Sequence, residues 1–355
     1  MRVIPFPPGS RHIAFLKLRP KQEITHAIRR HVYSTPIAAK QARNQWSRSL
    51  WFSSAGVVTF LALYGLYETN ASADNVQALR PDAFTPFTLV SREPISSTSS
   101  VFTLRPKAAG QNARVYDEAW AKGVWSVQVK QPQLQIARSY TPLPCIDTAE
   151  ATEPSDLKFL IRKDPKGEVS GYLHRLPIGA QIELRGPHLE YVIPDDVSEV
   201  LFLAGGTGIA PALQLVHTLL KSRSSPTAKL PTIRIMWANR RQEDALDLPN
   251  KPQTSSAQAI EIPLLKAKHQ AELSFRYFVD EDQTFIKEAT LLSLLSNSRR
   301  KGEVAGKKLI LISGPDGFVN YSAGPKVWKG GLELQGPLGG VLKKLNLDGW
   351  EVWKL

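Results

Sequence analysis

Hydrophobic and polar positions divide the chain into three stretches with different patterns. An uncharged run of eighteen residues, Leu50–Tyr67, comes first. Between Phe84 and Pro194, short apolar runs separated by Pro, Gly and polar residues predict a small antiparallel barrel. After Asp196, apolar runs alternate with helical stretches, which predicts an α/β domain, residues 195–355, whose parallel sheet has helices on both faces.

The expected elements can be given by their residue ranges. In the barrel, residues 84–194, strands are expected at Phe87–Val90, Val101–Leu104, Val124–Lys130, Leu134–Ala137, Leu157–Arg162 and Ile182–Leu184, with a short helix at Ser170–Leu176. In the α/β domain, strands are expected at Val200–Leu203, Ile233–Trp237, Ser274–Val279 and Leu309–Ile312, and helices at Ala210–Lys221 and Glu288–Ser296.

The uncharged run Leu50–Tyr67 reaches about 27 Å as a helix, at roughly 1.5 Å per residue, which just spans a bilayer core. Trp51 and Tyr64 lie near its ends, where amphipathic rings favour the headgroup level. A single N-terminal transmembrane helix is the favoured interpretation, and a buried core helix is the alternative. Residues 68–83 are mostly polar and are expected to form a linker.

Positive charge is concentrated ahead of this run. Residues 1–49 hold ten Lys and Arg against one acid, which leaves 35 basic and 31 acidic residues from Leu50 onward. An acid-poor, arginine-rich leader is typical of a mitochondrial presequence, and a disordered basic tail is the alternative. The positive-inside rule then places the C-terminal domains in the intermembrane space. A nucleic-acid partner is not expected, because the excess charge lies outside the folded domains.

The cysteine and histidine content excludes several classes of site. Cys145 is the only cysteine of the sequence, so an internal disulfide or a Cys-rich zinc or iron–sulfur site cannot form. The seven histidines show no paired ligand spacing, so no metal site is predicted. A redox role for Cys145 is not expected, because a resolving partner is missing.

Two motifs of the predicted barrel carry candidate chemistry. Arg138–Thr141 (RSYT) ends a predicted strand, where an arginine can hold phosphate oxygens bidentately and a tyrosine shares its face. Gly167–Ser170 (GEVS) starts the predicted short helix and can turn backbone N–H groups and a hydroxyl toward an anion. The alternatives are a surface arginine beside a core tyrosine and a routine helix cap.

A third motif, Gly205–Gly208 (GGTG), follows a buried strand and precedes a helix with Pro211 in its first turn. Glycines let the backbone approach a diphosphate closely, and the helix N-terminus favours its negative charge. The motif is neither GxGxxG nor a Walker loop, and a tight turn without a ligand is the alternative. The turn Gly314-Pro315, after a later strand, completes the set.

The order RxYT, GxxS, GGTGIAP and a late Gly-Pro turn resembles the ferredoxin-reductase family, with NADH–cytochrome b5 reductase especially similar. The similarity extends from about Phe84 to Gly317. The leader, the uncharged run and the C-terminal segment Gln335–Leu345 resemble a narrower group. That group is the fungal mitochondrial inner-membrane flavoprotein that assists haem attachment to cytochrome c.

The resemblance implies bound FAD and NADH or NADPH as the coenzyme. By resemblance, FAD is bound by Arg138, Ser139, Tyr140, Thr141, Gly167, Val169 and Ser170. By the same resemblance, NAD(P)H is received by Gly205, Gly206, Thr207, Gly208, Gly314 and Pro315. Thr141, beside the isoalloxazine, and Ser313, near the nicotinamide, are the expected catalytic positions.

Two positions depart from the reductase pattern. The family usually has Cys-Gly-Pro-Pro where this chain has Ser313–Asp316 (SGPD), which predicts poorer nicotinamide positioning and slower turnover. The family's chain commonly ends at an aromatic residue that covers the flavin. Trp353 is expected in that role, with Trp350 as the alternative.

The sequence leaves the choice of coenzyme open. Arg240 and Arg241 follow the second strand of the nucleotide domain and could meet a 2′-phosphate. Glu243 and Asp244 could instead favour an unphosphorylated ribose. Solvated charges in a loop are the simpler explanation for all four.

The predicted function is an FAD-dependent NAD(P)H reductase of the mitochondrial inner membrane that serves a one-electron acceptor. The narrower resemblance implies haem, cytochrome c haem lyase or apocytochrome c as acceptor or partner. One alternative is a flavin-binding assembly factor without turnover, tethered near haem lyase. Another is a cytochrome b5-type reductase on the outer membrane or the endoplasmic reticulum.

Overall fold

The computed structural model describes residues 78–355 apart from gaps at 108–109, 145–154, 223–229, 247–259, 261 and 301–305. The predicted leader, the predicted span and most of the linker lie outside the described residues, as does Cys145. No helix in the described part of the chain is both long and apolar enough to cross a membrane. The described residues belong to one compact unit, Ala73–Leu355.

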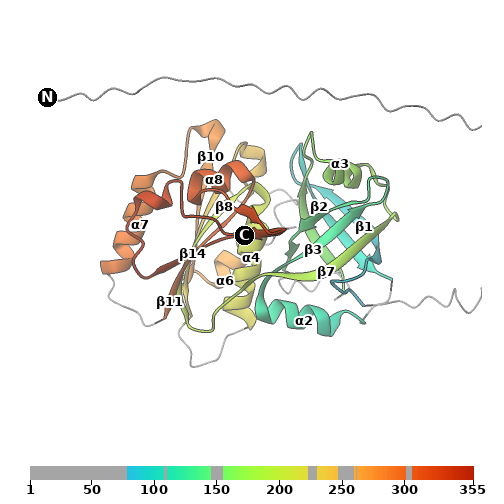
Figure 1. Ribbon diagram of the computed structural model, residues 1–355, viewed down its shortest axis with the longest axis horizontal. Helices are drawn as coiled ribbons and strands as arrows, with labels where there is room; N and C mark the ends of the chain where they lie inside the picture. The colour runs from blue at the N-terminus through green and yellow to red at the C-terminus, as the bar shows by residue number, and fades with distance from the viewer. Residues whose placement is uncertain are drawn as a thin grey trace, which may run out of the picture. The chain divides into compact units, whose positions relative to one another are not determined.

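Seven of the described strands form an antiparallel sheet in the order β4-β3-β7-β1-β2-β6-β5 (Figure 1). The strands are β1 Thr85–Pro94, β2 Ser99–Pro106, β3 Gly123–Gln131, β4 Ile136–Tyr140, β5 Pro142–Leu143, β6 Leu157–Arg162 and β7 Gln181–Val192. The helices that accompany this sheet are α2 Ala113–Lys122 and α3 Glu168–Arg175.

This sheet curls into a barrel because its two edge strands are joined directly. β4 and β5 lie at opposite ends of the strand order, yet only Thr141 separates them in the chain. Two peptide steps span at most about 7 Å, so the two edges must meet. Large apolar side chains, among them Phe87, Trp125 and Phe159, fill the barrel core. The predicted antiparallel barrel is confirmed.

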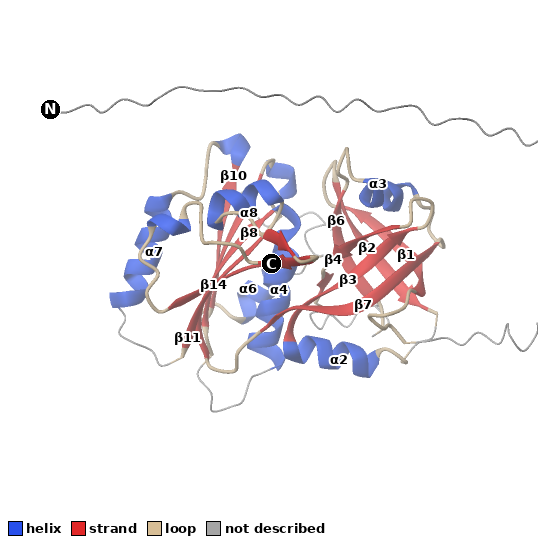
Figure 2. Ribbon diagram, in the orientation of Figure 1, coloured by secondary structure: helices blue, strands red, loops and turns tan. Residues whose placement is uncertain are grey.

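Five further described strands form a parallel sheet in the order β10-β9-β8-β11-β14 (Figure 2). These strands are β8 Val197–Gly205, β9 Thr232–Asn239, β10 Leu273–Val279, β11 Lys307–Ser313 and β14 Trp350–Lys354. The helices of this half are α4 Ile209–His217, α6 Ile262–Lys268, α7 Glu288–Arg300 and α8 Asp316–Ala323. Two short strands, β12 Val327–Lys329 and β13 Leu332–Leu334, form a separate hairpin.

Alternate residues of β8 face opposite helical layers. Val200 and Phe202 pack in a core with α4 and α6, whereas Leu201 and Leu203 pack with α7 and α8. The predicted parallel sheet with helices on both faces is confirmed. The chain runs outward from β8 to β9 and β10 and then returns to the other side for β11, so the strand order reverses beside β8. Ligands of open α/β sheets bind outside the strand ends at such a point.

Some elements differ from the sequence-based expectations. The strand expected at Leu134–Ala137 was placed too early: residues 132–135 form a turn, in which Gln135 has a φ of 53°, and β4 begins at Ile136. Elements that the sequence did not predict are α2, β5, α6, α8, β14 and the β12–β13 hairpin. The alternating WEVWK pattern of β14 was a usable strand signal.

One buried glutamine joins the barrel to the α/β half. Gln214 of α4 is fully buried, and its Oε1 accepts a hydrogen bond from the Trp125 backbone N–H at 2.9 Å. Its Nε2 donates to the Pro142 carbonyl oxygen at 2.9 Å. The barrel residues Val124 and Leu143 also pack in the same hydrophobic cluster as α4. The two sheets therefore share one continuous core.

Gln214→Ala should lower the free energy of unfolding by about 2–4 kcal/mol, because it leaves two buried backbone groups unpaired and opens a cavity. Urea unfolding followed by circular dichroism measures the change. The control is Gln181→Ala on the exposed start of β7, which should cost less than about 0.5 kcal/mol. Equal losses in the two variants would contradict the role assigned to Gln214.

Candidate functional site

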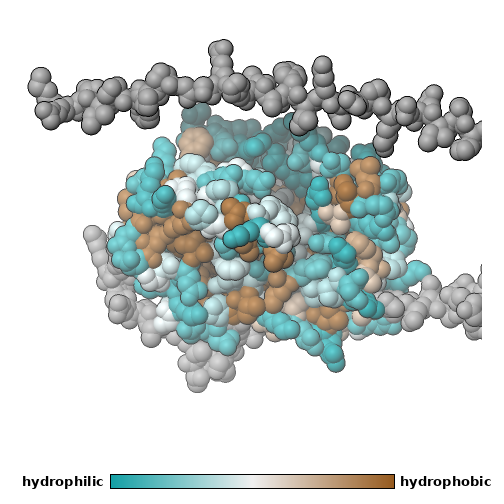
Figure 3. Space-filling model, in the orientation of Figure 1, coloured by the Kyte–Doolittle hydropathy of each residue, from teal (hydrophilic) through white to brown (hydrophobic). Residues whose placement is uncertain are grey.

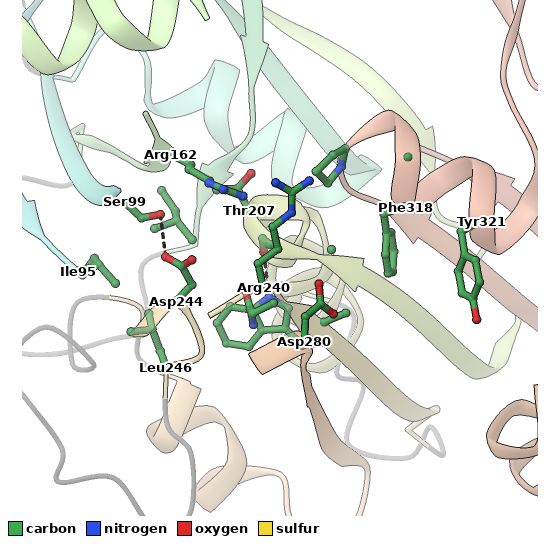
Figure 4. Close-up of a pocket in the computed structure, with 18 residues that line it drawn as sticks. Ile95, Ser99, Arg162, Thr207, Arg240, Asp244, Leu246, Asp280, Phe318 and Tyr321 are labelled. Atoms are coloured by element: carbon green, nitrogen blue, oxygen red, sulfur yellow. Dashed lines mark hydrogen bonds between the residues drawn. The ribbon is translucent and has the colours of Figure 1, made fainter. Parts of the chain in front are cut away.

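Two adjoining cavities lie where the barrel meets the carboxyl ends of the parallel strands. The larger has a volume of about 560 Å³ and is lined by the end of β4 and the start of α3. The smaller, drawn in Figure 4, has a volume of about 290 Å³ and lies at the ends of β8, β9 and β10. Four residues line both cavities: Arg162, Thr207, Arg240 and Pro315.

The larger cavity brings together the two barrel motifs and part of the nucleotide motif. From the residues expected to bind FAD, its lining includes Arg138, Ser139, Tyr140, Gly167, Val169 and Ser170. From the residues expected to bind the coenzyme, its lining includes Thr207, Gly314 and Pro315. A ligand in this cavity would therefore touch the barrel and the parallel sheet at once, as a flavin that receives a hydride must.

The turn before α3 is organised by Ser170. Its hydroxyl accepts a hydrogen bond from the Asp164 backbone N–H at 3.1 Å and donates to the Gly167 carbonyl oxygen at 3.2 Å. A Cβ added to Gly167 would lie 2.6 Å from that hydroxyl, so a side chain there would disturb the turn. The hydroxyl thus holds the loop in place. The first N–H groups of α3 lack partners within the helix and suit an anion.

Tyr140 keeps a protonated phenol, and Arg138 keeps a guanidinium that is only weakly paired; both groups can bind a cofactor. Burial raises the pKa of Tyr140 to about 12, against the opposing effect of the Arg138 charge. The phenol therefore stays protonated at neutral pH and can donate a hydrogen bond. Arg138 Nη2 lies 4.0 Å from a carboxylate oxygen of Glu168, and both side chains are more than half exposed. Because such a surface pair is weak, the guanidinium is available to a phosphate.

The glycine turn packs directly against the end of β11. A Cβ on Gly208 would lie 2.2 Å from the Ser313 carbonyl oxygen, and one on Gly314 would lie 3.0 Å from the Gly205 Cα. Gly206 and Gly314 have φ values of 53° and 156°, which L side chains rarely adopt. The two turns approach this closely only as glycines. Their backbone and the N-terminus of α4 then form a cradle for a diphosphate.

Two residues at the end of β9, Trp237 and Asn239, complete the smaller cavity, although the sequence did not predict them as site residues. The Trp237 indole N–H donates to the Gly206 carbonyl oxygen at 2.8 Å and supports the glycine turn. Asn239 is 4 % exposed, and its Nδ2 has no hydrogen-bond partner among the described residues. A buried unpaired donor costs about 1–3 kcal/mol, which a ligand acceptor would relieve. The available signal was the position of Asn239 at the carboxyl end of the second parallel strand.

The acidic pair considered for ribose binding instead joins the two halves of the unit. Glu243 accepts hydrogen bonds from the Ser97 hydroxyl at 2.5 Å and from Arg241 at 2.9 Å. Asp244 accepts one from the Ser96 hydroxyl at 2.5 Å. Ser96 and Ser97 lie in the turn between β1 and β2 of the barrel, and Figure 4 shows Asp244 bonded to that region. We call this set of contacts the serine latch; it occupies both carboxylates and Arg241.

Two arginines face the junction of the cavities. Arg162 ends β6 and Arg240 follows β9, and in Figure 4 both side chains are directed to the region above Thr207. Neither guanidinium has an ion pair within the described ranges. Two unpaired cations beside the glycine turn suit phosphate groups. The sequence did not predict Arg162 as a site residue.

Several expected site residues do not line these two cavities. Thr141 connects β4 to β5, and Ser313 is 8 % exposed at the contact with the glycine turn. Trp353 is 37 % exposed, and its ring centroid lies 5.4 Å from that of Tyr191 in β7. Trp350 belongs to the core on the α7 and α8 side of the sheet. Roles of these residues toward flavin or nicotinamide stay predictions.

Comparison with known proteins agrees with this geometry. Residues 86–193 match the oxidoreductase FAD-binding domain, and residues 202–323 match the oxidoreductase NAD-binding domain. The chain belongs to the ferredoxin-reductase-type flavoproteins. It is an NAD(P)H-dependent flavoprotein oxidoreductase, with FAD and NADH or NADPH as its cofactors. The buried unpaired donor of Asn239 and the glycine cradle fit such a dinucleotide.

Individual relatives fall into two groups. The cytochrome c mitochondrial import factor CYC2 of Saccharomyces cerevisiae is 24% identical, over 92% of this chain and 96% of its own length. NADH-cytochrome b5 reductase 2-A of Vanderwaltozyma polyspora is 26% identical, over 62% of this chain and 67% of its own length. In structure, the cytochrome b5 reductase domain of Ulva prolifera nitrate reductase matches with a TM-score of 0.50 at 20% identity, over 69% of this chain and 92% of that domain.

Asn239→Ala should weaken NAD(P)H binding about tenfold, because it removes one hydrogen bond of roughly 1–1.5 kcal/mol from the bound state. Titration of the coenzyme against the flavin absorbance measures the dissociation constant. The flavin content should stay unchanged, since Asn239 does not line the larger cavity. An unchanged coenzyme affinity would show that the orphan donor serves another purpose.

Glu243→Gln should lower the melting temperature at pH 7 by a small amount, and the difference should vanish as the pH falls from 4.5 toward 2. Hydrogen bonds from Ser97 and then Arg241 lower the pKa of Glu243 from 4.5 to about 2. The ionised latch therefore contributes stability above pH 4.5 and loses it as pH falls through the folded pKa. Thermal unfolding across this pH range measures the difference.

The matched control for the latch is Glu118→Gln, which removes an exposed carboxylate in an i,i+4 pair with Arg114. Its effect should be close to zero at every pH. A Glu243→Gln difference that does not shrink on acidification would contradict the latch.

Proposed function

We propose that this protein draws electrons from NAD(P)H through FAD and delivers them singly to haem or a haem-handling partner during cytochrome c maturation. The observation that supports the electron path is the joining of the Arg138–Tyr140 strand end, the α3 turn and the glycine turn in two adjoining cavities. The maturation role is supported by the similarity to the cytochrome c mitochondrial import factor CYC2 over most of the chain.

The residues of the larger cavity bind and orient FAD in this proposal. Arg138 and the first N–H groups of α3 hold its phosphates, and Tyr140 donates its phenolic proton in a hydrogen bond. Bound FAD supplies the chemistry of accepting a hydride and releasing electrons one at a time. The end of β4 and the start of α3, which line this cavity, would shield the bound FAD from water.

The residues of the smaller cavity bind the coenzyme. Gly205, Gly206 and the N-terminus of α4 receive its diphosphate, and Arg162 and Arg240 neutralise the negative charge at the junction. Asn239 donates to an acceptor of the nucleoside. Thr207 and Pro315 line both cavities, so they would contact the nicotinamide end where the two spaces adjoin.

The proposed location is the mitochondrial inner membrane, with the compact unit in the intermembrane space. The basic leader and the uncharged run Leu50–Tyr67 support this location. The similarity to the cytochrome c mitochondrial import factor CYC2 adds support for a mitochondrial location. Protease protection of the full-length chain, in intact and in outer-membrane-ruptured mitochondria, tests the orientation: digestion only after rupture is the expected result.

A flavin-binding assembly factor with little turnover is the second candidate. Ser313 favours this candidate. The residue ends β11 at the contact with Gly208, and the next residue, Gly314, lines the larger cavity. A side chain shorter than the usual cysteine at that point would position the nicotinamide less well. A misplacement near 1 Å can lower the rate about a hundredfold.

The first experiment is an anaerobic visible spectrum of the purified chain before and after NADH or NADPH. A flavin spectrum that bleaches is the expected result, and the faster coenzyme identifies the preference. Protein without flavin would refute the proposal. A flavin spectrum unchanged by both coenzymes would favour the assembly factor.

Arg138→Gln should lower the flavin content of the purified protein several-fold, because the phosphates lose a bidentate cation. The ratio of flavin to protein absorbance measures it. Arg114→Gln, on the exposed face of α2, is the control and should retain full flavin content.

A further inference from the structure

The β12–β13 hairpin lies on the protein surface, with Val327 and Leu334 at its base partly covered, at 37% and 43% exposed. All six of its strand positions are exposed, with Trp328 at 73% and Leu332 at 66%. Gly330 and Gly331 form its tip, with φ values of 61° and 78° that favour a tight hairpin turn. An isolated two-stranded hairpin is marginally stable in water, so a surface that covers these side chains would stabilise it.

Both faces of the hairpin carry apolar side chains. Residues paired across an antiparallel ladder share a face, and the pairs here are Val327 with Leu334 and Lys329 with Leu332. Trp328 pairs with Glu333 on the opposite face, where it is the large apolar residue. A flat protein partner would cover one face only. A fluid lipid layer into which the hairpin dips would cover both faces.

The charge around the hairpin is positive. The segment 326–344 contains Lys326, Lys329, Lys343 and Lys344 against the single acid Glu333. Lys326 pairs with Glu333 at 3.0 Å and Lys344 pairs with Glu288 at 3.8 Å, which leaves Lys329 and Lys343 in excess. Lysines beside exposed tryptophan and leucine complement a surface that is apolar inside and anionic at its edge.

The base of the hairpin is fixed by hydrogen bonds to Lys354 and Gln335, whereas its two strands are exposed. Lys354, which is 3 % exposed, donates from Nζ to the carbonyl oxygens of Pro325 at 3.0 Å, Pro337 at 3.3 Å and Gly324 at 3.4 Å. The Gln335 side chain also bonds both the N–H and the carbonyl of Lys354. The hairpin therefore projects from a rigid mount on β14. In Figure 3, apolar brown side chains reach the surface beside the C-terminus that Figure 1 marks.

We propose that the β12–β13 hairpin inserts into the headgroup region of an anionic phospholipid bilayer. Trp328 lies at the headgroup level, Leu332 and Leu334 reach the acyl boundary, and Lys329 meets lipid phosphates. The insertion is shallow, because the strand edges carry backbone groups that hydrocarbon cannot satisfy.

The length of chain before the described unit agrees with a position at a bilayer surface. Ten residues, 68–77, separate the predicted span from the first described residue, and they reach at most about 36 Å. A tether of this length raises the effective concentration of the hairpin at the membrane. Lipid binding by the hairpin depends neither on the predicted span nor on the proposed electron transfer.

The test is sedimentation of the Ala73–Leu355 unit with phosphatidylcholine vesicles that contain or lack cardiolipin. This unit holds all three hydrophobic clusters of the described residues, so it carries its own core. Binding to the cardiolipin vesicles is expected, and the double substitution Trp328→Ser with Leu332→Ser should weaken it about tenfold. The control Leu134→Ser, which removes a 56% exposed leucine from a barrel turn, should bind as the wild type does.

Each other outcome overturns the proposal. Absence of wild-type binding, or equal loss in the Leu134→Ser control, would show that the hairpin does not recognise lipid. Concentration-dependent self-association that the double variant abolishes would identify the hairpin as a contact between two copies of the chain. Bleaching of the flavin by coenzyme, measured on the same samples, separates these outcomes from a failure of the proposed reductase. If the double variant misfolds, the single variant Trp328→Ser replaces it in the sedimentation test and should also bind the cardiolipin vesicles more weakly than the wild type.

Discussion

The site depends on the hydrogen bonds of the Gln214 side-chain amide. The two cavities lie between the barrel and the parallel sheet, so they keep their shape only if the position of one relative to the other is fixed. One buried side chain satisfies a backbone N–H of β3 and a carbonyl of β5 from helix α4. That helix begins at the glycine turn, so the amide that fixes the barrel also fixes the nucleotide cradle relative to it. A continuous apolar core surrounds this contact and excludes water that would compete for the two hydrogen bonds.

Around this seam, the charged residues divide into those that hold the structure and those left for ligands. The serine latch occupies Glu243 and Arg241 at the rim of the smaller cavity. Arg162 and Arg240 face the cavity junction, and Asn239 retains a buried donor without a partner among the described residues. The first set makes its contacts on folding, whereas the two arginines stay available to phosphates and the buried donor of Asn239 costs free energy until an acceptor binds. The same division explains why a nucleotide would bind at the seam.

The hairpin and the latch show two uses of surface side chains. Glu243 and Ser97 are polar loop residues that make a specific link between the halves of the unit. Trp328 and Leu332 are residues of a kind usually found in cores, yet they are exposed on a hairpin whose base is clamped by Lys354. In both cases the role depends on how the backbone that carries the side chains is held. Side chains on a fixed backbone can bind a partner with a small loss of conformational entropy.

Local pattern and motif chemistry determined the two fold classes, most strands, the order of the domains and the glycine turn, because each depends on residues near one another in the chain. Gly205–Gly208 had to follow a buried strand and open a helix, and it does. Tertiary structure alone decided which distant residues share a space. Arg162, Asn239 and the pairing of Glu243 with Ser97 depend on segments up to about 146 positions apart, whose contacts leave no periodic trace in the sequence. The same is true of Gln214, which looks like a polar residue on an apolar helix until the barrel lies against it.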